Sequence, residues 1–374
     1  CFCIRMWLVC ACVSVFRWYP VLFSLAFYWI LRGVYVSLPL ARRLWRIRTS
    51  EPNTSTDPDR LKIGILGASG IAKIAVIYAS SKSESKSIVV GVASRDATKA
   101  KAYAEKYNIP KHYEGYQALL DDKMIDSVYI GIPTEYHYEW TKKAIIAGKH
   151  VLVEKPITLN HEEAVDIKNL LDETNEKRSK KGLKPLILLE GYHWRFHPVA
   201  LHAKHILNDV KYLGKIRNIA FDFSLYDPKV LFGGSKTRTK LLDRWCYAID
   251  TIRFSLPPDA KVAVKSAVLS ATRAEVKLSA TLRQDSSSSN SREVDINFFA
   301  EKAKLELPSW NLRVVGSMAS ISVVNIGHPY IYHSISLKPS HSKGASDETK
   351  SLQIYGKGET TFEHQLRAFA EAVK

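Results

Sequence analysis

The stretch Lys62-Ile-Gly-Ile-Leu-Gly-Ala-Ser-Gly-Ile-Ala72 decides the fold expected for this chain of 374 residues. An apolar strand runs into a turn that contains two glycines, and an apolar helix follows. Ser69 takes the place of the second glycine in the common G-x-G-x-x-G/A pattern, but a second strand about 20 residues later supplies the right context. Such a turn presents backbone N–H groups to a pyrophosphate. It therefore predicts a dinucleotide site formed by Gly67, Ala68, Ser69, Gly70, Ile71 and Ala72.

The second apolar strand ends in Val92-Ala-Ser-Arg-Asp96, where an NAD-binding fold places an acid for the ribose hydroxyls. Ser94 and Arg95 come first here, and Asp96 falls one or two positions late. Arg95 is therefore expected to bind a 2′-phosphate and to stack on adenine, with Ser94 in the same site, which favours NADP. The alternative is a solvated loop arginine.

Two later apolar strands should end at the same edge of the sheet. Pro133 and His137 follow the first of them, and His137 is either a cofactor or substrate contact or a first-turn residue of the next helix. The second ends on Glu154, Lys155 and Pro156. A lysine in a cleft at that edge can polarise a hydroxyl or carbonyl group, whereas at an open strand end it is a surface charge.

Strands alternate with amphipathic helices between residues 61 and 190, which predicts a doubly wound parallel sheet of the Rossmann type. From residue 191 to 374 the strands show alternating apolarity and one clear helix, at 241–254, which predicts an α+β domain with a large antiparallel sheet. Asn160 is expected to cap a helix at 161–177, and a last helix is expected at 362–373.

Asp243 and Tyr247 lie four positions apart in the helix expected at 241–254, so they share one face of it. A carboxylate and a phenol that converge there can handle a proton. The alternative, an exposed aspartate beside a half-buried tyrosine, is the commoner arrangement of such a pair.

The net charge of +17 arises partly from seven arginines before residue 50, where no acid occurs. The remaining excess is spread along the chain without a nucleic-acid-binding motif, so we expect no nucleic-acid partner. Four of the five cysteines lie in the first twelve residues, and Cys246 is alone in the body. This pattern excludes a disulfide framework in the globular part and shows no metal-ligand spacing.

Residues 6–41 are strongly apolar but are interrupted by Arg17 and Arg32, and four arginines follow them. We expect residues 1–50 to attach the chain to a membrane and to leave the globular part facing the cytosol. A cleaved signal peptide and a stretch that is not native coding sequence are the alternatives. Residues 51–60 are polar and contain prolines, which is typical of a linker.

Taken together, these residues resemble the Gfo/Idh/MocA oxidoreductase family, in particular its dihydrodiol dehydrogenase and NADP-dependent D-xylose dehydrogenase branch and its fungal members. The resemblance covers residues from Lys62 to the end. It depends on the glycine-containing turn, on the Asp243–Tyr247 spacing and on five further segments. These are Ala93-Ser-Arg95, Ala147-Gly-Lys-His-Val-Leu-Val-Glu-Lys-Pro156, Glu190-Gly-Tyr-His-Trp-Arg-Phe-His-Pro198, 314–325 and 360–369.

The resemblance implies a Rossmann domain, an α+β substrate domain that often forms a dimer interface, and a nicotinamide cofactor in the cleft. Lys155 matches the family's catalytic lysine and Tyr247 the proton-transferring tyrosine of this branch. Asp243 is their expected acidic partner, and Glu154 and Lys155 are expected beside the cofactor. His193, Arg195 and His197 are expected near the substrate. The family also continues past Lys374 with a helix that packs on the first domain, so we expect a truncated C-terminus.

Two departures from the family pattern lie near the expected substrate mouth. Arg238-Thr-Lys240 replaces a glycine-containing turn, and Trp245 replaces a glycine. The first hypothesis is an NADP-dependent dehydrogenase that oxidises a cyclic sugar or diol, for example a D-xylose-like pyranose to its lactone or a trans-dihydrodiol. The second is a catalytically silent NAD(P)-binding regulatory or structural protein, because a fold alone does not establish activity.

Overall fold

The structure is a computed structural model that describes residues 59–82, 85–226, 237–269, 273–283, 291–303, 309–329, 332–340, 350–354 and 358–374. Residues 51–374 belong to one compact unit. The expected membrane anchor at residues 1–50 and most of the linker lie outside the described residues. In the part of the chain that is described, no helix is both long and apolar enough to cross a bilayer.

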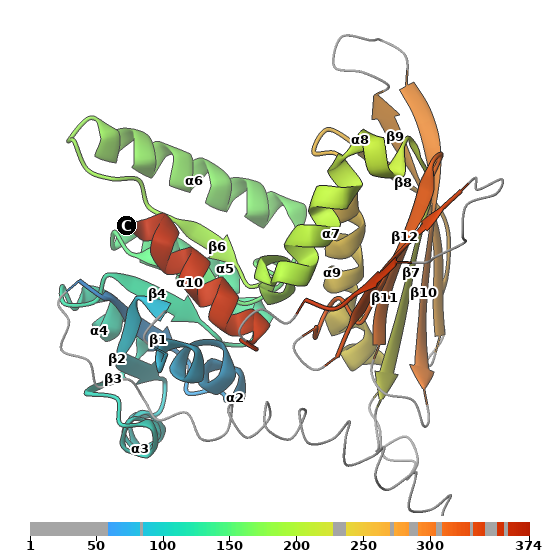
Figure 1. Cartoon of the computed structure of the whole chain (residues 1–374). Coiled ribbons are helices and arrows are strands. Elements are labelled where there is room, and N and C mark those ends of the chain that lie inside the picture. The colour runs from blue at the N-terminus through green and yellow to red at the C-terminus, as the bar shows by residue number, and fades with distance from the viewer. Residues whose placement is uncertain are drawn as a thin grey trace, which may run out of the picture. The chain divides into compact units, whose positions relative to one another are not determined.

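The first sheet contains six parallel strands in the order β3-β2-β1-β4-β5-β6, which confirms the predicted Rossmann arrangement (Figure 1). Its strands are β1 (Leu61–Leu66), β2 (Ser87–Ser94), β3 (Lys111–Glu114), β4 (Ser127–Ile130), β5 (His150–Val153) and β6 (Leu188–Glu190). The chain adds strands to one side of β1 as far as β3 and then to the other side from β4 onwards, so the strand order reverses between β1 and β4. Sheets of this kind bind ligands outside the carboxyl ends of the strands at that point. β3 was not predicted, because three of its four residues are exposed.

Helices cover both faces of this sheet. One face carries α2 (Gly70–Ala72), which continues as the π-helical turn η1 (Lys73–Tyr78), together with α3 (Ala97–Tyr107). The other face carries α4 (Tyr116–Asp121), α5 (His137–Ile146) and α6 (His161–Ser179). The expected cap of α6 is confirmed, because Oδ1 of Asn160 accepts a hydrogen bond of 2.8 Å from N–H of Glu163.

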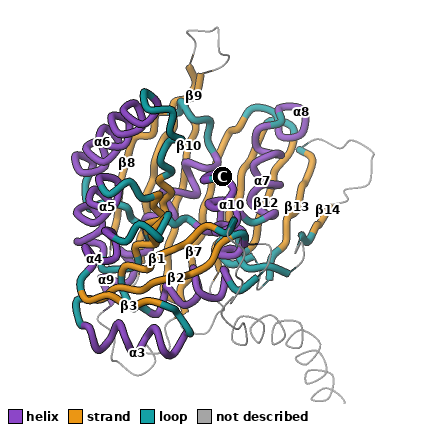
Figure 2. Tube along the Cα trace, turned by 90° about the vertical axis from the view of Figure 1, so that its left-hand side faces the viewer, coloured by secondary structure: helices purple, strands orange, loops and turns teal. Residues whose placement is uncertain are grey.

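The second sheet contains eight strands in the order β14-β13-β12-β11-β7-β10-β9-β8 (Figure 2). They are β7 (Ile216–Tyr226), β8 (Lys261–Leu269), β9 (Arg273–Arg283), β10 (Ser291–Ala303), β11 (Ser309–Gly316), β12 (Ala319–Val324), β13 (Ser334–Pro339) and β14 (Lys350–Leu352). All neighbouring pairs are antiparallel except β7 with β10. The large antiparallel sheet was predicted, whereas its parallel pair and β14 were not.

One face of the second sheet packs against helices that come from both sides of β7 in the sequence. They are η4 (His193–Phe196), α7 (Pro198–Asn208), α8 (Val210–Leu213) and α9 (Thr237–Ser255). Trp194, Val199 and Ile252 from these helices share a core with the inward side chains of the strands. This core fixes α9, which carries Tyr247, against the sheet.

The last helix, α10 (Thr361–Val373), packs on the first sheet although it follows the second sheet in the chain (Figure 1). Phe362, Leu366, Phe369 and Ala370 lie in the same apolar core as β1 and η1. A helix was predicted at 362–373, and the structure confirms it as α10. The boundary expected at residue 190 separates the two sheets, but the chain returns to the first sheet with α10.

His150 makes the stability of the first sheet sensitive to acid. Its Nδ1 accepts a hydrogen bond of 3.0 Å from N–H of Ile187, and burial, with a smaller effect of Arg178, lowers its pKa from 6.5 to about 4. The unfolded chain binds a proton at His150 more readily than the folded chain does, because the pKa is lower in the folded state. The free energy of unfolding is therefore unaffected by this group above pH 6.5 and decreases as the pH falls from 6.5 towards 4.

We therefore expect His150→Asn, which keeps an acceptor but cannot ionise, to lose less stability between about pH 7 and about pH 4.5 than the parent chain does. Denaturant unfolding at both pH values measures the difference. His112→Asn is the control, since His112 is exposed. An equal loss in His150→Asn and in the parent would contradict the prediction.

Candidate active site

The turn between β1 and α2 is packed tightly on one side and open on the other. Gly67 has a φ of +103°, and a Cβ there would lie 2.7 Å from Cγ2 of Ile132 and 2.9 Å from the carbonyl oxygen of Gly131. Only glycine fits this position without strain. Gly70 is exposed, and a Cβ there would meet no atom within 4 Å. The backbone at Gly70 therefore faces open space, as close approach of a pyrophosphate requires.

The other members of the turn hold its shape. The Ser69 hydroxyl accepts a hydrogen bond of 3.3 Å from N–H of Ala72, which caps α2. Ala68 and Ala72 are buried, and the Ile71 side chain is 37% exposed. The predicted turn residues thus lie together at the carboxyl end of β1.

Arg95 is the exposed residue at the carboxyl end of β2, next to this turn. Its guanidinium lies 5.4 Å from the ring centroid of Tyr136. Asp96 is committed elsewhere, because its Oδ1 accepts a hydrogen bond of 3.1 Å from N–H of Lys99 and so caps α3. Ser94 is buried, and its hydroxyl accepts from N–H of Asp96 at 3.3 Å. Arg95 also acts on Tyr116, because its charge opposes the rise in the pKa of that residue caused by burial. Arg95 is thus the exposed cation at this strand end, and one carboxylate oxygen of Asp96 is engaged in the cap of α3.

His137 is held by the backbone on both sides of its ring. Its Nδ1 lies 2.8 Å from the carbonyl oxygen of Pro156, and its Nε2 lies 2.8 Å from that of Ile132. The residue is 1% exposed and begins α5, just after the short helix η3 (Thr134–Tyr136), whose cap is Pro133. Of the two alternatives for His137, the structure favours the first-turn residue. Its ring fixes the loop after β5 to the loop after β4.

Glu154 and Lys155 follow β5 and face different surroundings. Glu154 is 8% exposed and accepts a hydrogen bond of 2.8 Å from the hydroxyl of Tyr129, and burial raises its pKa. Lys155 is half-buried, and its Nζ lies 4.9 Å from the ring centroid of Tyr247. The structure therefore brings together the two residues that were predicted to carry the chemistry, from the edge of the first sheet and from α9.

Tyr247 is 7% exposed and is enclosed by aromatic rings. Trp310 of β11 lies 4.6 Å from it between ring centroids, and Tyr192 lies 5.7 Å away in an edge-on orientation. The Tyr247 hydroxyl lies 3.3 Å from Nε2 of His193. His193, predicted near the substrate, is thus in direct contact with the candidate proton acceptor.

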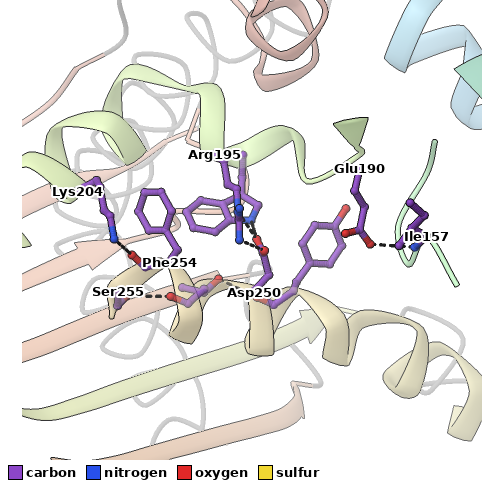
Figure 3. Close-up of polar contacts among 10 residues, drawn as sticks. Ile157, Glu190, Arg195, Lys204, Asp250, Phe254 and Ser255 are labelled. Atoms are coloured by element: carbon purple, nitrogen blue, oxygen red, sulfur yellow. Dashed lines mark hydrogen bonds and ion pairs between the residues drawn. The ribbon is translucent and has the colours of Figure 1, made fainter. Parts of the chain in front are cut away.

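A buried carboxylate that was not predicted, Asp250, lies on α9 one turn after Tyr247 (Figure 3). It accepts hydrogen bonds from Nε1 of Trp194 at 2.9 Å and from Nε of Arg195 at 3.0 Å, and it forms an ion pair with Arg195. Burial raises the pKa of Asp250 to about 6 although Arg195 opposes the shift. Arg195, predicted near the substrate, is therefore committed to Asp250, although its side chain remains 40% exposed.

Glu190 provides a half-buried carboxylate near Lys155. Its Oε1 accepts a hydrogen bond of 2.8 Å from N–H of Ile157, as Figure 3 shows. Burial raises its pKa, while the charges of Arg195 and Lys155 oppose the shift. Glu190 thus links the end of β6 to the loop that carries Lys155. Its position in the Glu190–Pro198 segment was a signal in the sequence, but the segment alone did not distinguish it from its neighbours.

His197 was also predicted near the substrate, and the structure shows that it has a structural role as a helix cap. His197 is fully buried, its Nδ1 accepts a hydrogen bond of 3.2 Å from N–H of Val199, and it caps α7. Its ring neighbours are His333 and His364. The side chains of Arg238, Lys240, Asp243 and Trp245 lie outside the described residues, so the proposed pairing of Asp243 with Tyr247 stays a prediction.

The site combines a cation, a phenol and a nucleotide-binding turn at one edge of a parallel sheet. Such a set can accept a proton from a substrate hydroxyl and can stabilise the negative charge that develops. Among the described residues no group of histidine, cysteine, aspartate and glutamate side chains could hold a metal ion.

Residues 61–180 match a family model described as an oxidoreductase family with an NAD-binding Rossmann fold. A D-xylose 1-dehydrogenase (NADP(+)) of Haloferax volcanii is 30% identical over 236 residues, which are 60% of this chain and 66% of that protein. A trans-1,2-dihydrobenzene-1,2-diol dehydrogenase of Xenopus tropicalis is 30% identical over 198 residues, 51% of this chain and 55% of that protein. The chain thus spans about two thirds or less of the length of these relatives.

Among solved structures, a 3-ketoreductase from Actinomadura kijaniata in complex with TDP-benzene and NADP is similar in fold. It has a TM-score of 0.63 and 26% identity, and the match covers 84% of this chain and 89% of that one. The similarity extends across both sheets, since the matched share exceeds the length of the first domain.

Proposed function

This chain contains a Gfo/Idh/MocA family domain at residues 61–180, and from that premise we propose that it is an NADP-dependent oxidoreductase that oxidises a cyclic sugar or diol. The observation that carries the proposal is the contact between Lys155 and Tyr247, with Nζ 4.9 Å from the ring centroid, at the carboxyl edge of the nucleotide-binding sheet. The named relatives act on D-xylose and on a trans-dihydrodiol, which supports this class of substrate.

The described residues fit an NADP molecule. The backbone at Gly70 would receive the pyrophosphate, because it is exposed and a Cβ there would meet no atom within 4 Å. Arg95 would bind the 2′-phosphate, since Asp96 is occupied in capping α3. When bound, NADP would supply the hydride acceptor of the reaction, and the protein would supply orientation and charge.

The chain's own residues would handle the proton. Tyr247 would accept the hydroxyl proton of the substrate on its phenolic oxygen, as a general base. The ammonium group of Lys155 would favour the negative charge on that oxygen and on the substrate oxygen. The aromatic rings of Trp310 and Tyr192 would keep Tyr247 in place and exclude water from its ring. An aldopyranose would leave as its lactone.

NADP preference is expected to depend on Arg95. Arg95→Glu should weaken NADP binding by about tenfold or more while NAD binding changes little, because one charge-assisted contact to phosphate is worth about 1.5–3 kcal/mol. Fluorescence titration of both cofactors measures the effect. Lys106→Glu makes the same charge change on an exposed residue at the other end of α3 and should leave the preference intact. Equal affinity of the parent chain for NAD and NADP would contradict the proposal.

A panel of aldopyranoses and cyclic diols, tested with NADP and monitored by the absorbance of NADPH, tests the activity itself. Turnover of at least one member supports the proposal. If the chain binds NADP but oxidises none of them, the activity proposal fails and the regulatory or structural alternative is favoured.

A further inference from the structure

We propose that Thr361, the first residue of α10, is a positioning residue that acts on Tyr247 through His193. The inference deepens the proposed function and rests on the role given there to Tyr247. The inference is based on two contacts. The Tyr247 hydroxyl lies 3.3 Å from Nε2 of His193, and Nδ1 of His193 lies 2.7 Å from Oγ1 of Thr361. The three residues come from α9, η4 and α10, so the chain of contacts joins the candidate base to the helix that packs on the first sheet.

All three side chains are removed from solvent. Thr361 is fully buried, His193 is 2% exposed and Tyr247 is 7% exposed. The His193 ring is held between Phe362, at 4.1 Å between ring centroids, and the stacked ring of His328 at 5.9 Å. These rings fix the plane of the imidazole, so its two nitrogens keep their partners.

The imidazole is neutral in this position. Burial, and to a smaller extent the neighbouring His328 and Lys155, lower the pKa of His193 well below its ordinary value. A neutral imidazole has one N–H donor and one acceptor nitrogen. If Nε2 accepts a hydrogen bond from Tyr247, Nδ1 must donate one to Thr361, and if Nε2 donates, Nδ1 must accept. The two contacts are therefore coupled.

Two arrangements satisfy both contacts. When Tyr247 carries its proton, its O–H donates to Nε2 and Nδ1–H donates to Oγ1 of Thr361. When Tyr247 is a phenolate, Nε2–H donates to the phenolate oxygen, and Nδ1 accepts from the hydroxyl of Thr361. A threonine hydroxyl can serve as donor and as acceptor, so it supports either tautomer, whereas a methyl group would support neither.

The position of Thr361 is itself fixed by the start of α10. The Thr360 hydroxyl accepts from N–H of Glu363 at 3.2 Å, and the Glu363 carboxylate accepts from N–H of Thr360 at 2.5 Å. This capping box begins the helix one residue before Thr361. The helix start thus holds the hydroxyl against His193 without a contribution from the substrate.

Other ionisable groups also face this pair from the surrounding elements. His328 and Lys155 act on His193, while Tyr129 and Tyr192 lie close to Tyr247. Cys246, Asp250 and Glu190 act in turn on Tyr192. A Thr361 substitution replaces none of these groups, and the serine variant controls for indirect effects on them.

The test compares Thr361→Val with Thr361→Ser. Valine keeps the shape but removes the hydroxyl, and serine keeps the hydroxyl. In the parent chain at neutral pH we expect nitrogen-15 NMR of the imidazoles, with His193→Gln identifying the signal, to show the proton of His193 on Nδ1. Thr361→Val should move it to Nε2, lower kcat by about tenfold with KM little changed, and shift the pH–rate profile. Thr361→Ser should retain the parent tautomer, rate and profile.

Each result decides one part of the inference. A His193 proton on Nε2 in the parent chain, or the same tautomer and pH profile in Thr361→Val as in the parent, overturns the positioning role. Thermal unfolding of the variants shows whether α10 stays folded, and Thr361→Ser keeps the test valid if valine destabilises it. If the parent oxidises no sugar or diol, the proposed function fails and the role of Thr361 in turnover fails with it, while the NMR result still reports separately on the contact.

Discussion

Tyr247→Phe should lower the rate of sugar or diol oxidation by roughly 10²- to 10⁴-fold, the range for loss of a positioned acid–base group. The substitution removes only the hydroxyl that lies 3.3 Å from His193. The ring contacts with Trp310 and Tyr192 stay, so the fold and the binding of NADP should be unchanged. Initial rates of NADPH formation measure the loss, and fluorescence titration of NADP checks the binding.

Tyr192→Phe is the matched control, because Tyr192 is a half-buried tyrosine beside Tyr247. Burial and the neighbouring charge of Glu190 raise the pKa of Tyr192 far above its ordinary value, so it is a poor base. We expect this variant to retain activity within a few-fold. Normal turnover by Tyr247→Phe would mean that the proton goes elsewhere, and His193 would then be the next candidate.

Local features of the site were accessible from the sequence because each depends on neighbouring residues. The turn at Gly67–Ala72, the end of β5 at Lys155 and the cap of α6 at Asn160 are set within a few positions of the chain. Arg95 was predicted from its place after the second strand, and the structure adds that Asp96 beside it accepts a hydrogen bond from N–H of Lys99.

The contacts that complete the site join residues that are far apart in the chain. His193 and Thr361 are separated by 168 positions, and Trp194 and Asp250 by 56. No periodicity connects such pairs, since each depends on how α9, α10 and η4 pack. The apolar face of α10 predicted a helix, but an apolar face does not specify which sheet it covers.

His197 is another residue whose partners only the structure shows. A histidine in a segment that matches a family motif suggested a ligand contact, yet its Nδ1 caps α7 and its ring is fully buried. His137 is similar, because both of its nitrogens face backbone carbonyl oxygens. The sequence pattern does not show which partner takes the hydrogen bonds of these two histidines.

Lys155→Met should lower turnover by roughly 10²-fold or more, with a much smaller effect on NADP affinity. Methionine keeps an unbranched apolar side chain beside the Tyr247 ring but removes the ammonium group that lies 4.9 Å from the ring centroid. The phenolate form of Tyr247 and the developing charge on the substrate oxygen would then lack the cation proposed to stabilise them. Initial rates and fluorescence titration of NADP separate the effect on chemistry from the effect on binding.

Two further variants show whether charge or position matters at this strand end. Lys155→Arg keeps the charge but places it on a broader, planar group, so we expect only partial activity. Lys62→Met removes a lysine near the amino end of β1, whereas Lys155 follows the carboxyl end of β5. This control should leave turnover unchanged. Activity of Lys155→Met within a few-fold of the parent would show that Lys155 is only a charge at a strand end, and Tyr247 would then need another cation to act as a base.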